Sequence, residues 1–177
     1  MKVIHNAEVI VGDYQFADSL KKEVLSLLKT AQTIGHTNVK ASLHTAFDWE
    51  PDNLQFRNLR AYIREQIEKV FKPGATADGC RAHLNSVDFW GNVYEKGDYA
   101  KSHCHKPHDY SFAYFVQSKW YYSPLVFTYS GKKIRPKEGR YVIFPSFLKH
   151  HVPEHRYKGK RITLSGNYRV DDSNFLK

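Results

Sequence analysis

Three histidines in the second half of the chain are the residues whose types and spacing point most directly to chemistry. His103 and His105 form a His-x-His pair at the end of a candidate strand, where side chains two positions apart point to the same face. His150 closes the run Phe-Pro-Ser-x-Leu-x-His, which follows a further candidate strand. Imidazole suits first-row transition metals, so the three side chains predict a metal site that leaves other coordination positions open.

A second feature, Arg161-x-Thr163, follows His150 within a run typical of a β-strand. Alternation along a strand predicts that Arg161 and Thr163 face the same way. A planar guanidinium pairs with a carboxylate through two parallel hydrogen bonds, and a hydroxyl can support it. These two residues therefore predict an anchor for a small dicarboxylate.

The N-terminal part of the chain predicts one strand and two helices. The strand is expected over residues 2–11, and Asp18 is the expected N-cap of the first helix. The second helix is expected to begin near Pro51-Asp52 and to end at Lys72-Pro73-Gly74. Apolar residues recur at helical spacing in both, at Leu20, Val24, Leu27 and Leu28 and then at Phe56, Leu59, Ile63, Ile67 and Val70.

The pattern changes after Gly79 to short runs of aromatic and β-branched residues without intervening helices. The predicted strands cover residues 81–94, 111–117, 125–129, 141–145 and 161–169. This pattern predicts a mainly β protein with a jelly-roll core and N-terminal helices packed on one face. We expect one domain over residues 1–177, with a helical layer over about 14–73 and a β core over about 80–170.

These motifs together resemble the Fe(II)/2-oxoglutarate-dependent oxygenases, and in particular a poorly characterised bacterial and phage group. The resemblance covers about residues 85–168 and implies a double-stranded β-helix with Fe(II) held by His103, His105 and His150. It also implies 2-oxoglutarate bound by Arg161 and Thr163, with Tyr114 and Asn92 as further candidates. The matching residues are Trp90-Gly91-Asn92, Gly97, His103-Cys104-His105, Ser111, Tyr114, the run Phe144–Val152, Arg161 and Asn167.

The chain departs from the commonest pattern of this family, His-x-Asp…His, because His105 stands where the family has Asp. Either the metal has three neutral ligands, or Asp109 after Pro107 supplies the carboxylate. Phe112 also stands where related sequences have Gly, and a ring there would narrow the substrate entrance. The resemblance implies hydroxylation of an unidentified substrate, which is a protein side chain such as proline, a small molecule or a nucleic acid.

Two other functions are compatible with parts of the sequence. Gly97 and the His-x-His pair fit the first motif of a cupin, a three-histidine metalloprotein or dioxygenase that would not use 2-oxoglutarate, but this class gives Arg161 no role. The formal net charge of +9 fits a basic β-rich module that binds nucleic acid. We expect a cytoplasmic protein without membrane attachment, because the two cysteines are too few for a disulfide framework and no apolar run reaches the length of a membrane span.

Overall fold

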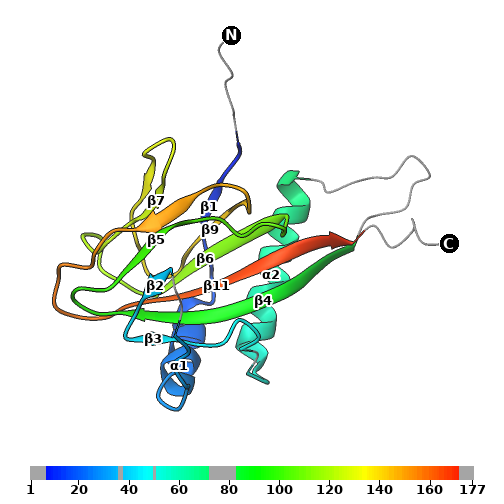
Figure 1. The fold of residues 1–177 in the computed structure, drawn as a ribbon. Coiled ribbons are helices and arrows are strands. Elements are labelled where there is room, and N and C mark those ends of the chain that lie inside the picture. Colours follow the sequence, from blue (N-terminus) through cyan, green and yellow to red (C-terminus); the bar gives the residue numbers. More distant parts are fainter. Residues whose placement is uncertain (1–6, 36–37, 50, 72–82, 172–177) are drawn as a thin grey trace, which may run out of the picture.

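Two antiparallel sheets lie over one another in the computed structural model, which describes residues 7–35, 38–49, 51–71 and 83–171 (Figure 1). The first sheet has six strands in the order β1-β9-β6-β11-β4-β3, and the second has five in the order β2-β5-β10-β7-β8. The strands are β1 (Ile10–Asp13), β2 (Val39–Lys40), β3 (Leu43–His44), β4 (His83–Tyr94), β5 (Tyr99–His103), β6 (Tyr110–Gln117), β7 (Leu125–Phe127), β8 (Lys133–Ile134), β9 (Arg140–Pro145), β10 (His150–Val152) and β11 (Arg161–Asp171).

From β4 onward the chain passes back and forth between the two sheets. The six-stranded sheet receives β4, β6, β9 and β11, whereas the five-stranded sheet receives β5, β7, β8 and β10. This alternation is the connectivity of a jelly roll, and it brings strand ends that are far apart in sequence to the same end of the sandwich. The prediction of a mainly β protein is confirmed.

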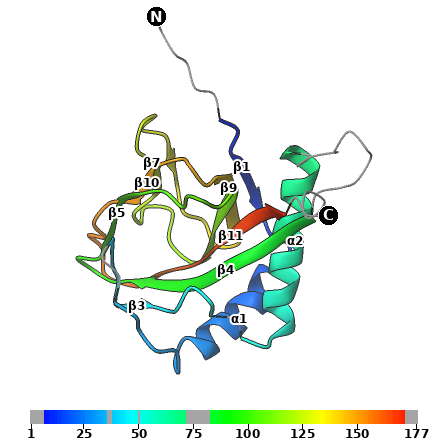
Figure 2. The same cartoon turned by 45° about the vertical axis from the view of Figure 1, so that its right-hand side comes forward.

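The two helices, α1 (Ala17–Leu27) and α2 (Leu54–Phe71), lie on the outer side of the six-stranded sheet (Figure 2). Their apolar faces join one core cluster with that sheet, because residues three or four apart on a helix share a face. The helical members of this cluster are Leu20, Val24, Leu28, Phe56, Leu59, Ile63 and Ile67. Among the residues that the structure describes, neither helix has the length and apolar character needed to cross a bilayer.

Some local predictions need correction. The N-cap of α1 is Phe16, and Asp18 lies inside the first turn. The side chain of Asn53 accepts a hydrogen bond from the backbone N–H of Gln55 (2.8 Å), so α2 begins slightly later than predicted. Val70 is 46% exposed, so the buried stripe of α2 ends at Ile67, one turn earlier than predicted.

The strand predictions after residue 83 are close to the observed elements, whereas the first strand is displaced. β1 begins at Ile10, and residues 2–6 of the predicted strand lie outside the described residues, as does the predicted helix end at Lys72–Gly74. Strands β2, β3 and β8 have two residues each, which is too short for a sequence pattern to show them. The single domain over residues 1–177 stays a prediction.

A second core cluster fills the space between the two sheets. Along β6 the side chains alternate between the two cores: Phe112, Tyr114 and Val116 belong to the helix-side cluster, and Phe115 belongs to the inter-sheet cluster. The inter-sheet cluster consists of Ala100, Phe115, Leu125, Phe127, Ile134, Val142, Phe144 and Val152. Only side chains on the inter-sheet side of these strands can reach a pocket inside the sandwich.

Candidate metal and ligand site

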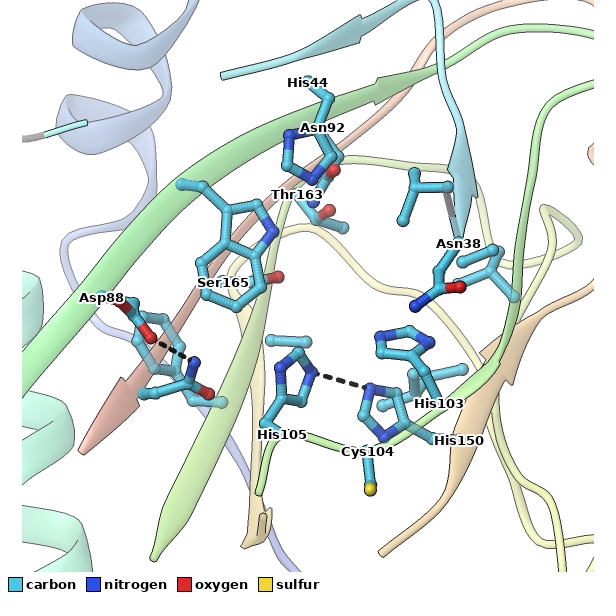
Figure 3. Close-up of a pocket in the computed structure, with 18 of the residues that line it drawn as sticks. Asn38, His44, Asp88, Asn92, His103, Cys104, His105, His150, Thr163 and Ser165 are labelled. Atoms are coloured by element: carbon cyan, nitrogen blue, oxygen red, sulfur yellow. Dashed lines mark hydrogen bonds between the residues drawn. The ribbon is translucent and has the colours of Figure 1, made fainter. Parts of the chain in front are cut away.

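Three imidazoles converge at one end of the sandwich (Figure 3). His103 ends β5 and His150 begins β10, and the two residues are directly paired across these antiparallel strands. His105 follows two residues after β5, and its Nε2 lies 3.3 Å from Nε2 of His150. One nitrogen from each ring lies within 4.8 Å of the others, so the three side chains can hold one transition-metal ion.

Two of these rings are oriented by backbone carbonyls. Nδ1 of His103 lies 2.7 Å from the carbonyl oxygen of Lys101, and Nδ1 of His150 lies 2.9 Å from that of Leu148. A carbonyl oxygen can only accept, so Nδ1 carries the proton and Nε2 keeps its lone pair for a ligand bond. Burial, together with the nearby His103, lowers the pKa of His150 to about 4, which keeps this ring neutral.

His105 reaches the group by a different route from the one predicted. The prediction placed it on a strand with His103, but β5 ends at His103 and His105 lies in the following loop. Its backbone N–H donates to the carbonyl oxygen of Ser146 (2.8 Å), which ties this loop to the segment before His150. Its ring packs near the Trp90 ring, with centroids 5.5 Å apart. Loop anchoring, not strand alternation, therefore positions this side chain.

The structure does not bring Asp109, the alternative to His105, into the histidine group. One carboxylate oxygen of Asp109 accepts a hydrogen bond from the backbone N–H of Val170 (2.8 Å). The backbone of Asp109 also pairs with Tyr168 and Ser146. These contacts direct the carboxylate toward β11, and among the described residues the candidate metal group contains His103, His105 and His150 without a carboxylate.

Arg161 lines the same pocket and is almost completely buried, with 2% of its surface exposed. Its Nε–H donates to the carbonyl oxygen of Ser123 (2.9 Å), and the guanidinium carbon lies 5.0 Å and 5.1 Å from the ring centroids of Tyr94 and Phe115. Nη1 is buried without a hydrogen-bond partner among the described residues. Burial lowers the pKa of Arg161 to about 10, so the side chain is still a cation at neutral pH.

Thr163 and Asn92 lie beside this arginine end of the pocket, as predicted for ligand-binding residues. They are directly paired between β11 and β4, and both are buried. Figure 3 shows them with His44 on the side of the pocket away from the three imidazoles. Like Nη1 of Arg161, the side-chain oxygen of Asn92 is buried and has no hydrogen-bond partner within the part of the chain that the structure describes. Burying polar atoms without hydrogen-bond partners costs free energy, so this end of the pocket suits a polar ligand. The whole pocket has a volume of about 360 Å³.

Tyr114 does not reach the pocket. Its ring lies in the helix-side core, 6.1 Å from that of Tyr14, and it is completely buried there. The strand prediction for β6 was right, but the choice of face was wrong for this residue. Phe112 shares that core, where its ring packs over Gly166, so its bulk is accommodated by the missing side chain of that glycine.

A polar network that no sequence motif indicates lies beside the histidines. Asp88 accepts hydrogen bonds from Asn167 Nδ2 (2.7 Å) and pairs with His108 Nε2 (3.0 Å). The network continues from Asn167 Oδ1 to the hydroxyls of Ser111 and Ser146. Ser146 also holds the loop of His105, so the network fixes the wall of the pocket. Asp88 carried no motif signal, because only the pairing of β4 with β11 brings it to Asn167.

Comparison with protein families gives one match. The model described as a putative 2OG-Fe(II) oxygenase matches residues 127–167, which contain His150, Arg161 and Thr163. No curated protein matches the chain.

Several solved structures share the fold at low sequence identity. A viral collagen prolyl hydroxylase from Paramecium bursaria Chlorella virus-1, in complex with 2-oxoglutarate, has a TM-score of 0.69 at 13% identity, covering 92% of this chain and 96% of that one. A Pseudomonas putida prolyl-4-hydroxylase has a TM-score of 0.69 at 14% identity, covering 93% and 94%. HygX from Streptomyces hygroscopicus, with nickel and 2-oxoglutarate bound, has a TM-score of 0.63 at 12% identity, covering 93% and 83%. These findings confirm the jelly-roll fold and the resemblance found in the sequence.

Proposed function

We propose that this chain is an Fe(II)- and 2-oxoglutarate-dependent hydroxylase whose metal is held by His103, His105 and His150 and whose cosubstrate is anchored by Arg161. The observation that carries the proposal is the convergence of three imidazole nitrogens in a pocket that also contains a buried, incompletely paired guanidinium. A metal centre alone would leave that cation unexplained, whereas a dicarboxylate cosubstrate accounts for both ends of the pocket.

The donor set fits Fe(II), which accepts imidazole ligands and is held in this fold with open coordination positions. Bound together, the metal and cosubstrate supply oxygen activation, in which 2-oxoglutarate and dioxygen become succinate and carbon dioxide while one oxygen atom enters a substrate C–H bond. The protein supplies orientation and a largely buried pocket. Three neutral ligands leave the metal with more positive charge than two histidines and one carboxylate would.

The cosubstrate role of Arg161 follows from its surroundings. The guanidinium lies against the Tyr94 and Phe115 rings, and its Nε–H donates to the carbonyl oxygen of Ser123. Nη1 is left to donate to the distal carboxylate of 2-oxoglutarate, and Thr163 on the same strand can add a hydroxyl donor. Asn92, whose side-chain oxygen has no partner among the residues described by the structure, is the further candidate for this ligand.

The first substrate that we propose is a prolyl side chain of a protein. Support comes from the solved structures with the same fold, since prolyl hydroxylases occur among them more than once. The same set includes HygX with hygromycin B bound, so a small-molecule substrate is the alternative within the oxygenase reading. We further propose that the enzyme is a single domain over residues 1–177 and works in the reducing cytoplasm, which agrees with its low cysteine content.

The metal proposal is tested with neighbouring histidines. His150→Ala should abolish stoichiometric Fe(II) binding measured anaerobically, because it removes a ligand buried at the centre of the group. His151→Ala is the matched control, since Nδ1 of His151 instead contacts the Thr128 hydroxyl and the ring is outside the group. Equal iron contents in the two variants would contradict the proposed ligand set.

The reaction is tested by two measurements on the same protein. The anaerobic Fe(II) complex should develop a visible charge-transfer band on addition of 2-oxoglutarate, and proline-containing peptides should gain one oxygen atom by mass spectrometry while succinate forms. If the band appears and succinate forms slowly while the peptides are not oxidised, proline is not the substrate, but the proposal of a 2-oxoglutarate-dependent oxygenase stands. Loss of the band would favour the cupin alternative, which would turn over without 2-oxoglutarate.

A further inference from the structure

A second surface, away from the chemistry of the pocket, combines exposed aromatic rings with cations. Trp120 is 69% exposed, although tryptophan is usually well buried. Its ring contacts Tyr121 (centroids 5.8 Å apart), and Tyr121 in turn contacts Tyr157 (5.0 Å), which is 43% exposed. These three rings, from the loop after β6 and the loop between β10 and β11, form one continuous group that we call the aromatic surface.

The aromatic surface is bordered by positive charge. Arg135 lies over the Trp120 ring (5.9 Å to its centroid), and Lys119 lies over the Tyr121 ring (5.9 Å). Arg156 and Lys158 flank Tyr157 in the chain and are exposed. None of these four cations forms an ion pair with another described residue.

Little negative charge lies nearby to neutralise these cations. Within residues 153–160 the one acidic residue is Glu154, which is exposed. Glu95 pairs with Lys160 (3.2 Å), and Glu138 pairs with Lys21 (2.7 Å). The surface therefore carries a net positive charge, in agreement with the formal charge of +9 for the whole chain.

We infer that the aromatic surface binds single-stranded nucleic acid. Exposed flat rings stack on unpaired bases, and cations spaced between the rings neutralise phosphates. An acidic peptide would use the cations but not the exposed rings of Trp120 and Tyr157, and duplex nucleic acid keeps its bases stacked inside. The combination of both features favours a single strand over either alternative.

The surface is structurally connected to the oxygenase pocket. Tyr122, next to Tyr121, contacts the buried ring of His155 (4.7 Å), and the carbonyl oxygen of Ser123 accepts the hydrogen bond from Arg161 Nε (2.9 Å). The loop after β6 is thus in direct contact with the Arg161 side chain, which lines the pocket. Strand binding here does not depend on the proposed reaction, so the two can be tested separately.

The test is fluorescence anisotropy of a labelled single-stranded RNA of mixed sequence, about 12 nucleotides long, with the whole chain. With four cations on four phosphates, affinity should fall about 50-fold between 50 and 200 mM salt. Trp120→Ala should weaken binding about 5- to 150-fold, because one stacked base is lost. Combined Lys119→Ala and Arg135→Ala should lower the slope of log affinity against log salt by about 1.4.

Tyr129→Ala is the matched control. Tyr129 is also highly exposed (81%) and also lies near a cation, Lys149 (5.9 Å), but it is outside the aromatic surface. The Tyr129→Ala variant should bind RNA with the affinity of the unmodified chain. Thermal melting should show that all variants are folded.

Three outcomes would overturn the inference. The first is RNA binding by Trp120→Ala that equals that of the control. The second is an affinity for a duplex of the same sequence that equals the affinity for the single strand. The third is an equal affinity for poly-glutamate of the same charge. Either of these two results would indicate that charge alone drives binding. Trp120→Ala should bind Fe(II) and 2-oxoglutarate as the unmodified chain does. If the RNA-binding inference fails, the proposed oxygenase reaction is therefore not affected, and if the oxygenase reaction is not found, the RNA-binding inference is not affected.

Discussion

Replacing Arg161 with Met tests whether the buried guanidinium is kept for a ligand or for the fold. Met is unbranched and apolar and keeps most of the aliphatic part of the arginine side chain, so the substitution mainly removes the charge and its hydrogen bonds. Burial lowers the pKa of Arg161 from 12.5 to about 10. At about 1.36 kcal/mol for each pKa unit, holding this cation in the folded protein without a ligand costs about 3 kcal/mol.

The contacts that Arg161 makes in the absence of ligand roughly offset this cost. Two cation–π contacts contribute about 1 kcal/mol each. The hydrogen bond to the carbonyl of Ser123 contributes about 1 kcal/mol. Arg161→Met should therefore change the free energy of unfolding of the ligand-free protein by no more than about 1 kcal/mol, which moves the melting temperature by no more than about 4 °C.

The assay is thermal melting with and without 2-oxoglutarate, with Ni(II) in the metal site to prevent turnover. At a 2-oxoglutarate concentration 100 times the dissociation constant, the unmodified protein should gain about 2.7 kcal/mol, or about 5–11 °C. The variant should gain less than about 1 kcal/mol at that concentration, because truncating a buried charge pair costs about 2–5 kcal/mol, which is about 30-fold or more in affinity.

Two results would refute this reasoning. Removing one partner of a complete buried ion pair costs about 3–5 kcal/mol, so a fall of about 6 °C or more in the ligand-free melting temperature would mean that Arg161 is structural. A full ligand-induced shift in the variant would mean that 2-oxoglutarate is anchored elsewhere. Arg161→Lys should recover part of the shift, because an ammonium restores the charge but not the planar fork.

The remaining predictions concern the ligand set, the packing of β11 and the pH dependence of stability. His105→Asp should still bind iron in a metal assay. Asp109→Ala should also bind iron but should have a lower melting temperature, because the hydrogen bond to the backbone of Val170 is lost. Loss of iron in Asp109→Ala alone would mean that Asp109 is the ligand. Gly166→Ala should lower the free energy of unfolding by about 1–3 kcal/mol in urea titration, because its Cβ would lie 2.5 Å from the backbone oxygen of Asp88; an unchanged midpoint would contradict this close approach. Burial holds the pKa of His155 below 6.5, so the unfolded chain takes up a proton that the folded chain does not, and stability should fall as pH decreases below about 6.5. His155→Gln should reduce that fall in melts between pH 7.5 and 5.5, and an identical pH profile would mean that this ring does not contribute.

The sequence was sufficient to predict features that depend on local repeat patterns. The alternation of aromatic and β-branched residues predicted β4, β6, β9 and β11 to within a few residues, because a strand with one face in a core must alternate. Helical spacing likewise identified α2 and its buried stripe. The three histidines and Arg161 could be found because their side chains carry distinctive chemistry at distinctive positions.

Tertiary structure alone decided which of the candidate side chains meet. Tyr114 was expected beside 2-oxoglutarate, but its position along β6 points its side chain toward the helices. Both faces of this strand are buried, and alternation in the sequence does not show which core each face contacts. His105 and Asp109 lie in the same loop after β5, and only the hydrogen bonds to Ser146 and Val170 separate their directions.

The electrostatic state of the pocket also depends on the fold. In the sequence, Arg161 and Asp88 cannot be distinguished from charged residues on the surface. Their environments are formed by strands that are distant in the chain. Pairing of β11 with β4 and β6 removes Arg161 from water, and Nη1 finds no partner in the described parts of the chain, which is the basis for the anion site that we propose. The sequence by itself determined the strand pattern and the candidate chemistry, whereas burial and strand parity, which arise only when the sheets pack, determined which residues can carry that chemistry out.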